Sequence, residues 1–331
     1  MKKTIAILLA LVMALGLFAG CAASTEGEST AAPTTAPTTA PTTAPTDPEP
    51  PADTPVVADC VNCEEEDVEW TKWTATDALP AEAGHFILQN DVTLTAECNW
   101  KSIGVLCLDL NGKTVTQTTV GQRIANIGAA VVSIYDSSAE KTGKFLPASA
   151  TEDETVMKYR WAVGFLMSKD AEFNIYGGTI DCSQVESGGR YGSCVTVDAG
   201  TLTIYDGKLI GGTTTNTGSG GAVMSIMAGA EVYVKGGELI GGTVPESTHA
   251  NDGGGVAQVL GTMYVEGGKI VGGTVAAEGG CLKVRKGGKL FVSPGAEFVP
   301  GTAAAGNTIW VQTGGEVTLP AGSTIDVVYQ G

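Results

Sequence analysis

The sequence predicts an all-β fold, a single-stranded right-handed parallel β-helix with about 30 residues and three strands per coil, behind a disordered tether. The stretch "YVKGGELIGGT" at 233–243 returns as "YVEGGKIVGGT" at 264–274, 31 residues later. Turn glycines recur at a similar spacing over 86–331, where no convincing amphipathic helix occurs. A stacked coil explains such repetition, because each coil buries its faces only against its neighbours. Parallel crossovers are almost always right-handed.

The first element, residues 1–20, is predicted to be a lipoprotein signal peptide. Two lysines precede the apolar run "IAILLALVMALGLF", which is too short to span a bilayer comfortably and is typical of a signal peptide. The residues that follow, Ala19, Gly20 and Cys21, resemble the lipobox of bacterial lipoproteins. That resemblance implies a lipid on Cys21, and with it a location on the extracellular face of the cell membrane. An ordinary secretory signal with an incidental cysteine is the alternative.

Residues 21–58 form the predicted tether, rich in threonine, proline and alanine. The repeat "PTTAPTTAPTTAPT" cannot bury a core, so this segment should stay extended and solvated. No later segment is apolar enough to cross a membrane, so any membrane attachment rests on Cys21 alone. The whole chain has a formal net charge of −17, which argues against nucleic acid as a partner.

An N-terminal cap segment is predicted over 59–85, and the parallel β-helix over 86–331. One ladder of turn glycines marks the coils: Gly112, Gly143, Gly178, Gly207, Gly237, Gly268, Gly295 and Gly322. A second ladder lies about seven residues upstream: Gly200, Gly229, Gly261, Gly288 and Gly315. Each unit therefore holds three short strands, two tight turns and a longer, variable loop after "GGT". A β-sandwich is the alternative, but it does not explain two ladders.

Two resemblances accompany this pattern. From Phe86 to the C-terminus the glycine-cornered coils look like the right-handed β-helices of the pectate-lyase-like superfamily. The segments "EWTKWTATDALPAEAGHFILQNDVTL", "LCLDLNGKTVTQ" and "VSIYD" more narrowly resemble surface β-helix proteins of anaerobic Gram-positive bacteria. These resemblances imply a cell-surface β-helix.

Strand alternation predicts which side chains point inward. One parity of the middle strand is apolar and should form the core: Leu202, Ile204, Val232, Val234, Met263, Val265, Leu290 and Val292. The other parity should face water and carries two aromatic columns, Tyr135, Tyr176 and Tyr205, and beside it Tyr233, Tyr264 and Phe291. With Lys235 and Glu266 these columns are a candidate glycan platform. The alternative is a ladder that only stabilises neighbouring strands.

No catalytic residue and no cofactor is predicted. Neither histidine, His85 or His249, lies in a pattern typical of polysaccharide-cleaving β-helices, and Asn251 and Asp252 are too thin a ligand set for calcium. Two carboxylates converging from separate coils would still suffice for a glycosidase.

The cysteines predict no metal site. The Cys60–Cys63 pair favours a local disulfide or two thiols over zinc, which would need Cys98, Cys107 or His85 to complete its ligands. Cys194 and Cys281 should occupy equivalent places three coils apart, too far for a disulfide.

The predicted function is non-catalytic binding or adhesion at the cell surface, with a polysaccharide, from a host or a cell wall, as the expected partner. A polysaccharide lyase or glycoside hydrolase with an unrecognised site is the alternative. A purely structural surface spacer is the second alternative.

Overall fold

The structure is a computed structural model that describes residues 56–60, 65–148, 162–187, 193–214, 221–245 and 253–331. The regular elements in these ranges are all strands, so the all-β prediction is confirmed. The predicted signal peptide and residues 21–55 of the predicted tether, with Cys21, lie outside the described residues, as do Cys63, His249, Asn251 and Asp252. The last three residues of the predicted tether, 56–58, lie in a strand, β1 (Val56–Cys60), so the ordered chain begins before the predicted boundary.

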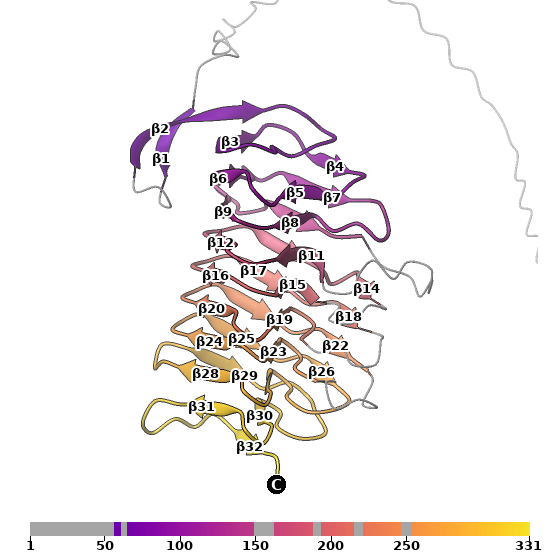
Figure 1. Cartoon of the computed structure of the whole chain (residues 1–331), viewed down its shortest axis with the longest axis vertical. Coiled ribbons are helices and arrows are strands. Elements are labelled where there is room, and N and C mark those ends of the chain that lie inside the picture. Colours follow the sequence, from indigo (N-terminus) through magenta and orange to yellow (C-terminus); the bar gives the residue numbers. More distant parts are fainter. Residues whose placement is uncertain (1–55, 61–64, 149–161, 188–192, 215–220, 246–252) are drawn as a thin grey trace, which may run out of the picture. The chain divides into compact units, whose positions relative to one another are not determined.

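The strands form a right-handed parallel β-helix built from four sheets (Figure 1). The first sheet contains β1 (Val56–Cys60), β2 (Glu65–Trp73), β3 (Gly84–Leu88), β6 (Gly104–Asp109), β9 (Ala130–Tyr135), β12 (Glu172–Ile175), β16 (Thr201–Ile204), β20 (Glu231–Val234), β24 (Thr262–Val265), β28 (Lys289–Val292) and β31 (Glu316–Thr318). The second contains β4 (Val92–Leu94), β7 (Thr114–Gln117), β10 (Lys144–Leu146), β13 (Thr179–Asp181), β17 (Lys208–Ile210), β21 (Glu238–Ile240), β25 (Lys269–Val271) and β29 (Glu297–Val299). The third contains β5 (Cys98–Trp100), β8 (Ala125–Ile127), β11 (Ala162–Met167), β15 (Ser193–Val197), β19 (Met224–Ile226), β23 (Ala257–Val259), β27 (Leu282–Val284), β30 (Ile309–Val311) and β32 (Val327–Tyr329).

A fourth, short sheet extends the predicted coil. Its two-residue strands are β14 (Glu186–Ser187), β18 (Thr213–Thr214), β22 (Thr243–Val244) and β26 (Thr274–Val275). The sequence predicts a variable loop after "GGT", and the structure instead begins that connection with a parallel strand in these coils. Two paired residues per coil are too few to produce a readable alternation in sequence, which explains the difference.

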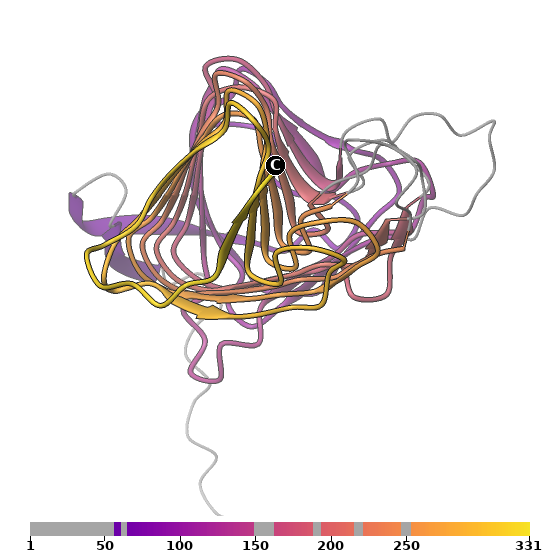
Figure 2. The ribbon, with the colours of Figure 1, turned by 90° about the horizontal axis from the view of Figure 1, so that it is seen from below.

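The coils from β16 to β28 repeat in a constant register in the first sheet. In the first sheet Thr203 pairs with Tyr233, Tyr233 with Tyr264, and Tyr264 with Phe291, each one coil further along the stack. Successive coils superimpose when viewed along the stack (Figure 2). The glycine ladder has a backbone reason, because Gly237 and Gly268 have φ angles of 74° and 73°, a conformation that other residues rarely adopt.

The core lies inside the coil, as the alternation predicts. Leu202, Val232, Met263 and Leu290 are at most 1% exposed and belong to one apolar cluster that runs the length of the stack. Such burial removes most of each side chain from water and contributes roughly 1.5–3 kcal/mol per residue.

The outward parity needs one correction. The sequence predicts that Ser133, Asn174 and Thr203 face water, but they are 0%, 3% and 7% exposed. The three residues form one register column between Cys107 and Tyr233, so each has side chains of the neighbouring coils directly on either side of it. A side chain that points out of the coil is therefore not always exposed to solvent.

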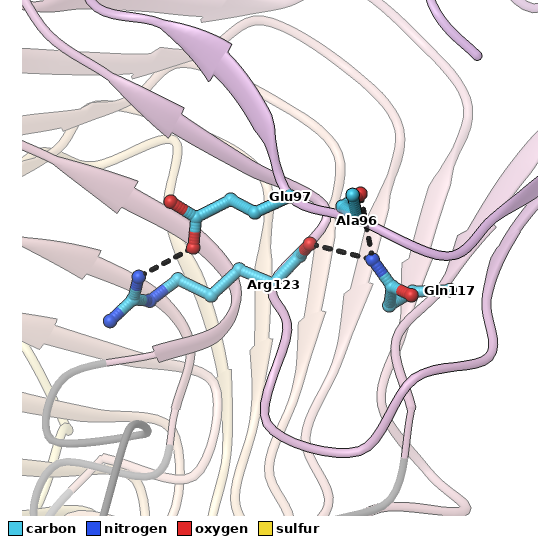
Figure 3. Close-up of polar contacts among 4 residues, drawn as sticks. All are labelled: Ala96, Glu97, Gln117 and Arg123. Atoms are coloured by element: carbon cyan, nitrogen blue, oxygen red, sulfur yellow. Dashed lines mark hydrogen bonds and ion pairs between the residues drawn. The ribbon is translucent and has the colours of Figure 1, made fainter.

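Side-chain hydrogen bonds hold the long connections between strands. Figure 3 shows the connection between β7 and β8, where the buried Gln117 amide donates to the carbonyl oxygens of Ala96 (3.1 Å) and Arg123 (3.0 Å). The Arg123 guanidinium donates to the Glu97 carboxylate at 2.6 Å. Backbone groups that have no strand partner in this connection are thereby satisfied.

Candidate functional site

The two predicted aromatic columns are present as stacks of rings. Tyr135, Tyr176 and Tyr205 stack with centroid distances of 4.9 and 4.4 Å and interplanar angles of 2° and 7°. Tyr233, Tyr264 and Phe291 stack at 4.6 and 5.1 Å, with angles of 6° and 13°. The parallel register of β9, β12 and β16 fixes the distances in the first column, and that of β20, β24 and β28 fixes those in the second, because paired residues of neighbouring strands lie one coil apart.

This stacking limits what the columns can offer a ligand. Each inner ring has both faces against its neighbours, so Tyr176 and Tyr264 present mainly ring edges and hydroxyl groups. A sugar that packs on an aromatic face would need an unoccupied face. The geometry therefore favours contacts of a sugar with ring edges and hydroxyl groups over packing of the sugar on the face of a ring.

Polar groups border the columns. The Tyr233 hydroxyl donates to the Glu231 carboxylate at 3.1 Å, and partial burial together with this carboxylate raises the pKa of Tyr233. The Lys235 ammonium lies 4.9 Å from the centroid of the Tyr205 ring, a cation–π contact that continues the first column. Glu266 is exposed in the next coil.

The first column ends beneath the β1–β2 hairpin. The Tyr135 ring meets the Trp70 ring edge-on at a centroid distance of 5.6 Å and packs beside a small cluster that contains Cys60, Ile87 and Cys107. Tyr135 is therefore partly covered, and only the remainder of the predicted platform faces outward.

An open groove of about 470 Å³ lies on another side of the coil, at the corner between the second and fourth sheets. Its floor is the glycine pairs of three "GGT" repeats, continued by Pro300 and Gly301 in the fourth coil, and one wall is a column of threonines one coil apart. These threonines are Thr213, Thr243, Thr274 and Thr302. Thr213 and Thr243 are partly exposed, and Thr274 and Thr302 are exposed, so the column lines the groove along its length.

The glycine floor follows from the close approach of successive coils. A Cβ added at Gly242 would collide with the Gly212 carbonyl oxygen, and one added at Gly273 would collide with the Gly242 carbonyl oxygen. Any larger residue would push the coils apart here. The same requirement leaves a shallow surface without side chains. This surface was not predicted as a site from the sequence, although the repeated "GGT" was its signal.

A row of buried polar residues on the outer side of the third sheet was also not predicted from the sequence. Thr196, Ser225 and Gln258 are 0% exposed, and Lys283, 1% exposed, continues the row. The Lys283 ammonium donates to the Glu278 carboxylate at 2.9 Å and lies 4.9 Å from the Trp310 ring centroid. Removing one partner of such a buried ion pair leaves an uncompensated charge, so the pair is expected to be structural.

The two most buried aspartates in the described residues serve turns. Asp109 accepts hydrogen bonds from the backbone amides of Asn111 and Ser137, both at 2.9 Å. Asp136 accepts from the amides of Gly112 (2.8 Å) and Gly143 (2.7 Å). Carboxylates that satisfy backbone donors in this way close turns, and the role does not require a reaction.

The cysteines fall into distinct environments. Cys182 and Cys194 form a disulfide with Cα atoms 6.0 Å apart. Cys194 and Cys281 occupy equivalent places in their coils, as predicted from the repeat. Burial raises the pKa of the Cys281 thiol to about 12 and that of Cys98 to about 11, so both are poor nucleophiles at neutral pH. Cys60, His85 and Cys107 come together from three separate segments.

No family model, curated protein or solved structure matches the chain. Within the residues that the structure describes, no helix has the length and apolar character needed to cross a bilayer.

Proposed function

We propose that this chain is a non-catalytic cell-surface protein that binds an extended polysaccharide along its β-helix. The groove between the second and fourth sheets carries the proposal, because it spans four coils, with a threonine in each and a pair of glycines in three of them. Repetition of one binding unit along a line matches a ligand that is itself a linear repeat.

The chemistry of the groove suits sugars. Threonine hydroxyls both donate and accept hydrogen bonds, as sugar hydroxyls do. Equivalent side chains recur about every 4.8 Å along the stack. Sugar rings of an extended β-linked chain recur at a similar distance, so each threonine can meet a successive ring. The glycine floor lets that chain approach the backbone closely.

The aromatic columns form a second proposed contact surface. Tyr176, Tyr205, Tyr233, Tyr264 and Phe291, with Tyr135 at the covered end, would meet a glycan through ring edges and hydroxyls, assisted by Lys235 and Glu266. The stacking of the rings on one another equally supports a structural role, in which the columns only stabilise neighbouring strands and bind no ligand.

We further propose the setting in which this binding takes place. The lipobox-like sequence at Cys21 supports a lipid anchor and an extracellular location, and the coil pattern supports membership of the pectate-lyase-like superfamily. The acidic net charge favours neutral or cationic glycans over anionic ones.

The decisive experiment compares two sets of substitutions on a polysaccharide panel, reading both retention and new reducing ends or unsaturated uronides. Thr213→Val, Thr243→Val and Thr274→Val together remove three groove hydroxyls while preserving shape. Each lost hydrogen bond costs about 1 kcal/mol, so Kd should rise roughly a hundredfold. Tyr233→Ala with Tyr264→Ala tests the columns.

Thr201→Val and Thr262→Val, two threonines of the first sheet, are the matched control and should leave binding unchanged. Loss of binding only in the tyrosine variant would move the site to the columns. Product formation by the unmodified chain would replace the binding proposal with the enzyme alternative, and neither retention nor product would favour the spacer.

A further inference from the structure

The β1–β2 hairpin brings a cysteine onto the outer face of the first coils. β1 pairs antiparallel with β2, and the end of β2 pairs in parallel with β3. His85 on β3 and Cys107 on β6 are register partners in neighbouring coils, so both point to the same face. Cys60, the last residue of β1, meets them there, and its side chain is 1% exposed against 0% for Cys107.

The three side chains are close enough to share one ion. The Sγ atoms of Cys60 and Cys107 lie 3.3 Å apart, and one donor atom from each of the three residues lies within 4.8 Å of the others. A tetrahedral Zn²⁺ ion, with bonds of about 2.3 Å to sulfur and 2.0 Å to nitrogen, holds such donors roughly 3.5–3.8 Å apart. To reach that geometry the two sulfurs would move apart by about 0.5 Å, and a separation at the 4.8 Å limit would close by about 1.3 Å.

The chemistry of these donors selects the kind of ion. Two sulfurs and an imidazole nitrogen suit zinc, whereas magnesium and calcium require oxygen ligands. A disulfide between Cys60 and Cys107 is the alternative explanation of the sulfur contact, and peptide mapping distinguishes it from a shared ion.

The surroundings resemble those of a structural site. Trp70 packs edge-on against His85 at a centroid distance of 5.3 Å, and Ile87 closes the same apolar cluster. The Tyr135 hydroxyl lies 3.7 Å from the Cys60 sulfur, where it can donate to a thiolate. Such neighbours orient metal ligands and limit solvent access.

We propose that Cys60, His85 and Cys107 bind one Zn²⁺ ion, which fastens the N-terminal hairpin to the first coils of the β-helix. Three protein ligands leave the fourth tetrahedral position to water or another donor. The function of the ion would be to cap the stack, since an end coil lacks a neighbour on one side. The proposal is independent of glycan binding.

The test measures metal in the full chain, purified under reducing conditions with zinc present. Elemental analysis should give about one zinc per chain, and cobalt substitution should produce thiolate-to-cobalt charge-transfer absorption. Cys60→Ser, His85→Ala and Cys107→Ser should each weaken zinc binding at least about tenfold. Cys98→Ser is the matched control, because Cys98 is outside the cluster, and it should bind zinc as the unmodified chain does.

Hydrogen exchange provides a readout that does not depend on the variants. Chelation of zinc from the unmodified chain should accelerate amide exchange in β1 and β2 and leave β16 to β28 unchanged. Reduced, folded chain that takes up neither zinc nor cobalt would overturn the proposal. A Cys60–Cys107 disulfide recovered by peptide mapping, or cobalt absorption that persists without both cysteines, would overturn it equally.

Discussion

At the scale of single residues, the partial burial of Tyr176 in the first aromatic column raises the pKa of its phenol. Its ring lies between those of Tyr135 and Tyr205, and burial, followed by the hydrogen bond with Tyr205, raises its pKa above the ordinary value near 10. The folded state therefore favours the neutral phenol more than the unfolded chain does. This contribution is complete below pH 10 and is lost as the pH rises from there towards the higher folded-state pKa.

Tyr176→Phe should accordingly reduce the loss of melting temperature with rising pH above pH 10. We expect the melting temperature of the unmodified chain to fall more steeply above pH 10 than that of the variant, because phenylalanine has no proton to lose. Thermal unfolding followed by circular dichroism from pH 8 to 11 measures this difference. Tyr329→Phe is the control, since Tyr329 is 60% exposed, and an equal slope in all three proteins would contradict the prediction.

The convergence of Cys60, His85 and Cys107 could not be predicted from the sequence. The sequence shows the Cys60–Cys63 pair, but three ligands that come from a hairpin and two coils share no fixed spacing. The short coil that separates His85 from Cys107 departs from the main repeat, so their common column was not visible without the strand register.

At the scale of elements, alternation and turn glycines predicted most of the first sheet. The inward parity of β16, β20, β24 and β28 is confirmed because apolar side chains alternate there without interruption. The fourth sheet and the groove beside it were not predicted. They depend on close contact between glycines of successive coils, and glycine carries no hydrophobic signal from which to infer a face.

The second aromatic column should contribute unequally along its length. Tyr264 stacks on two rings and Tyr233 on one, and an aromatic pair is worth roughly 0.5–1.5 kcal/mol beyond its buried area. Tyr264→Ala should therefore lower the free energy of unfolding by about 1 kcal/mol more than Tyr233→Ala. Urea denaturation measures both values, with Tyr329→Ala as an exposed control. Equal losses would show that ring stacking adds nothing to stability.

At the scale of the whole molecule, the predicted order is anchor, tether and β-helix. The all-β coil could be predicted from sequence, because each unit of about 30 residues repeats the same local pattern. A strand that is unclear in one unit can therefore be recognised from its counterpart in the next. The ligand could not be predicted in this way, since repetition defines a scaffold, while recognition depends on which outward residues remain exposed.

Anchoring is testable on the intact cell. If Cys21 carries the lipid, Cys21→Ala should release the protein into the medium or leave an uncleaved precursor, because the acyl chains provide the membrane affinity. Metabolic labelling with a fatty-acid probe, followed by fractionation, measures this. Label that persists in the variant would place the lipid elsewhere, and Cys98→Ser should keep both label and location.

The four equivalent threonine rows of the groove also have a statistical consequence. Under the proposed glycan binding, a short oligosaccharide that occupies two rows would have three positions, each displaced by one coil, and this multiplicity alone would improve its free energy of binding by about RT ln 3, or 0.7 kcal/mol. Such a ligand can slide from one position to the next without full release. A longer chain loses this freedom as it fills every row, so its affinity should rise with length less steeply than the added contacts would suggest.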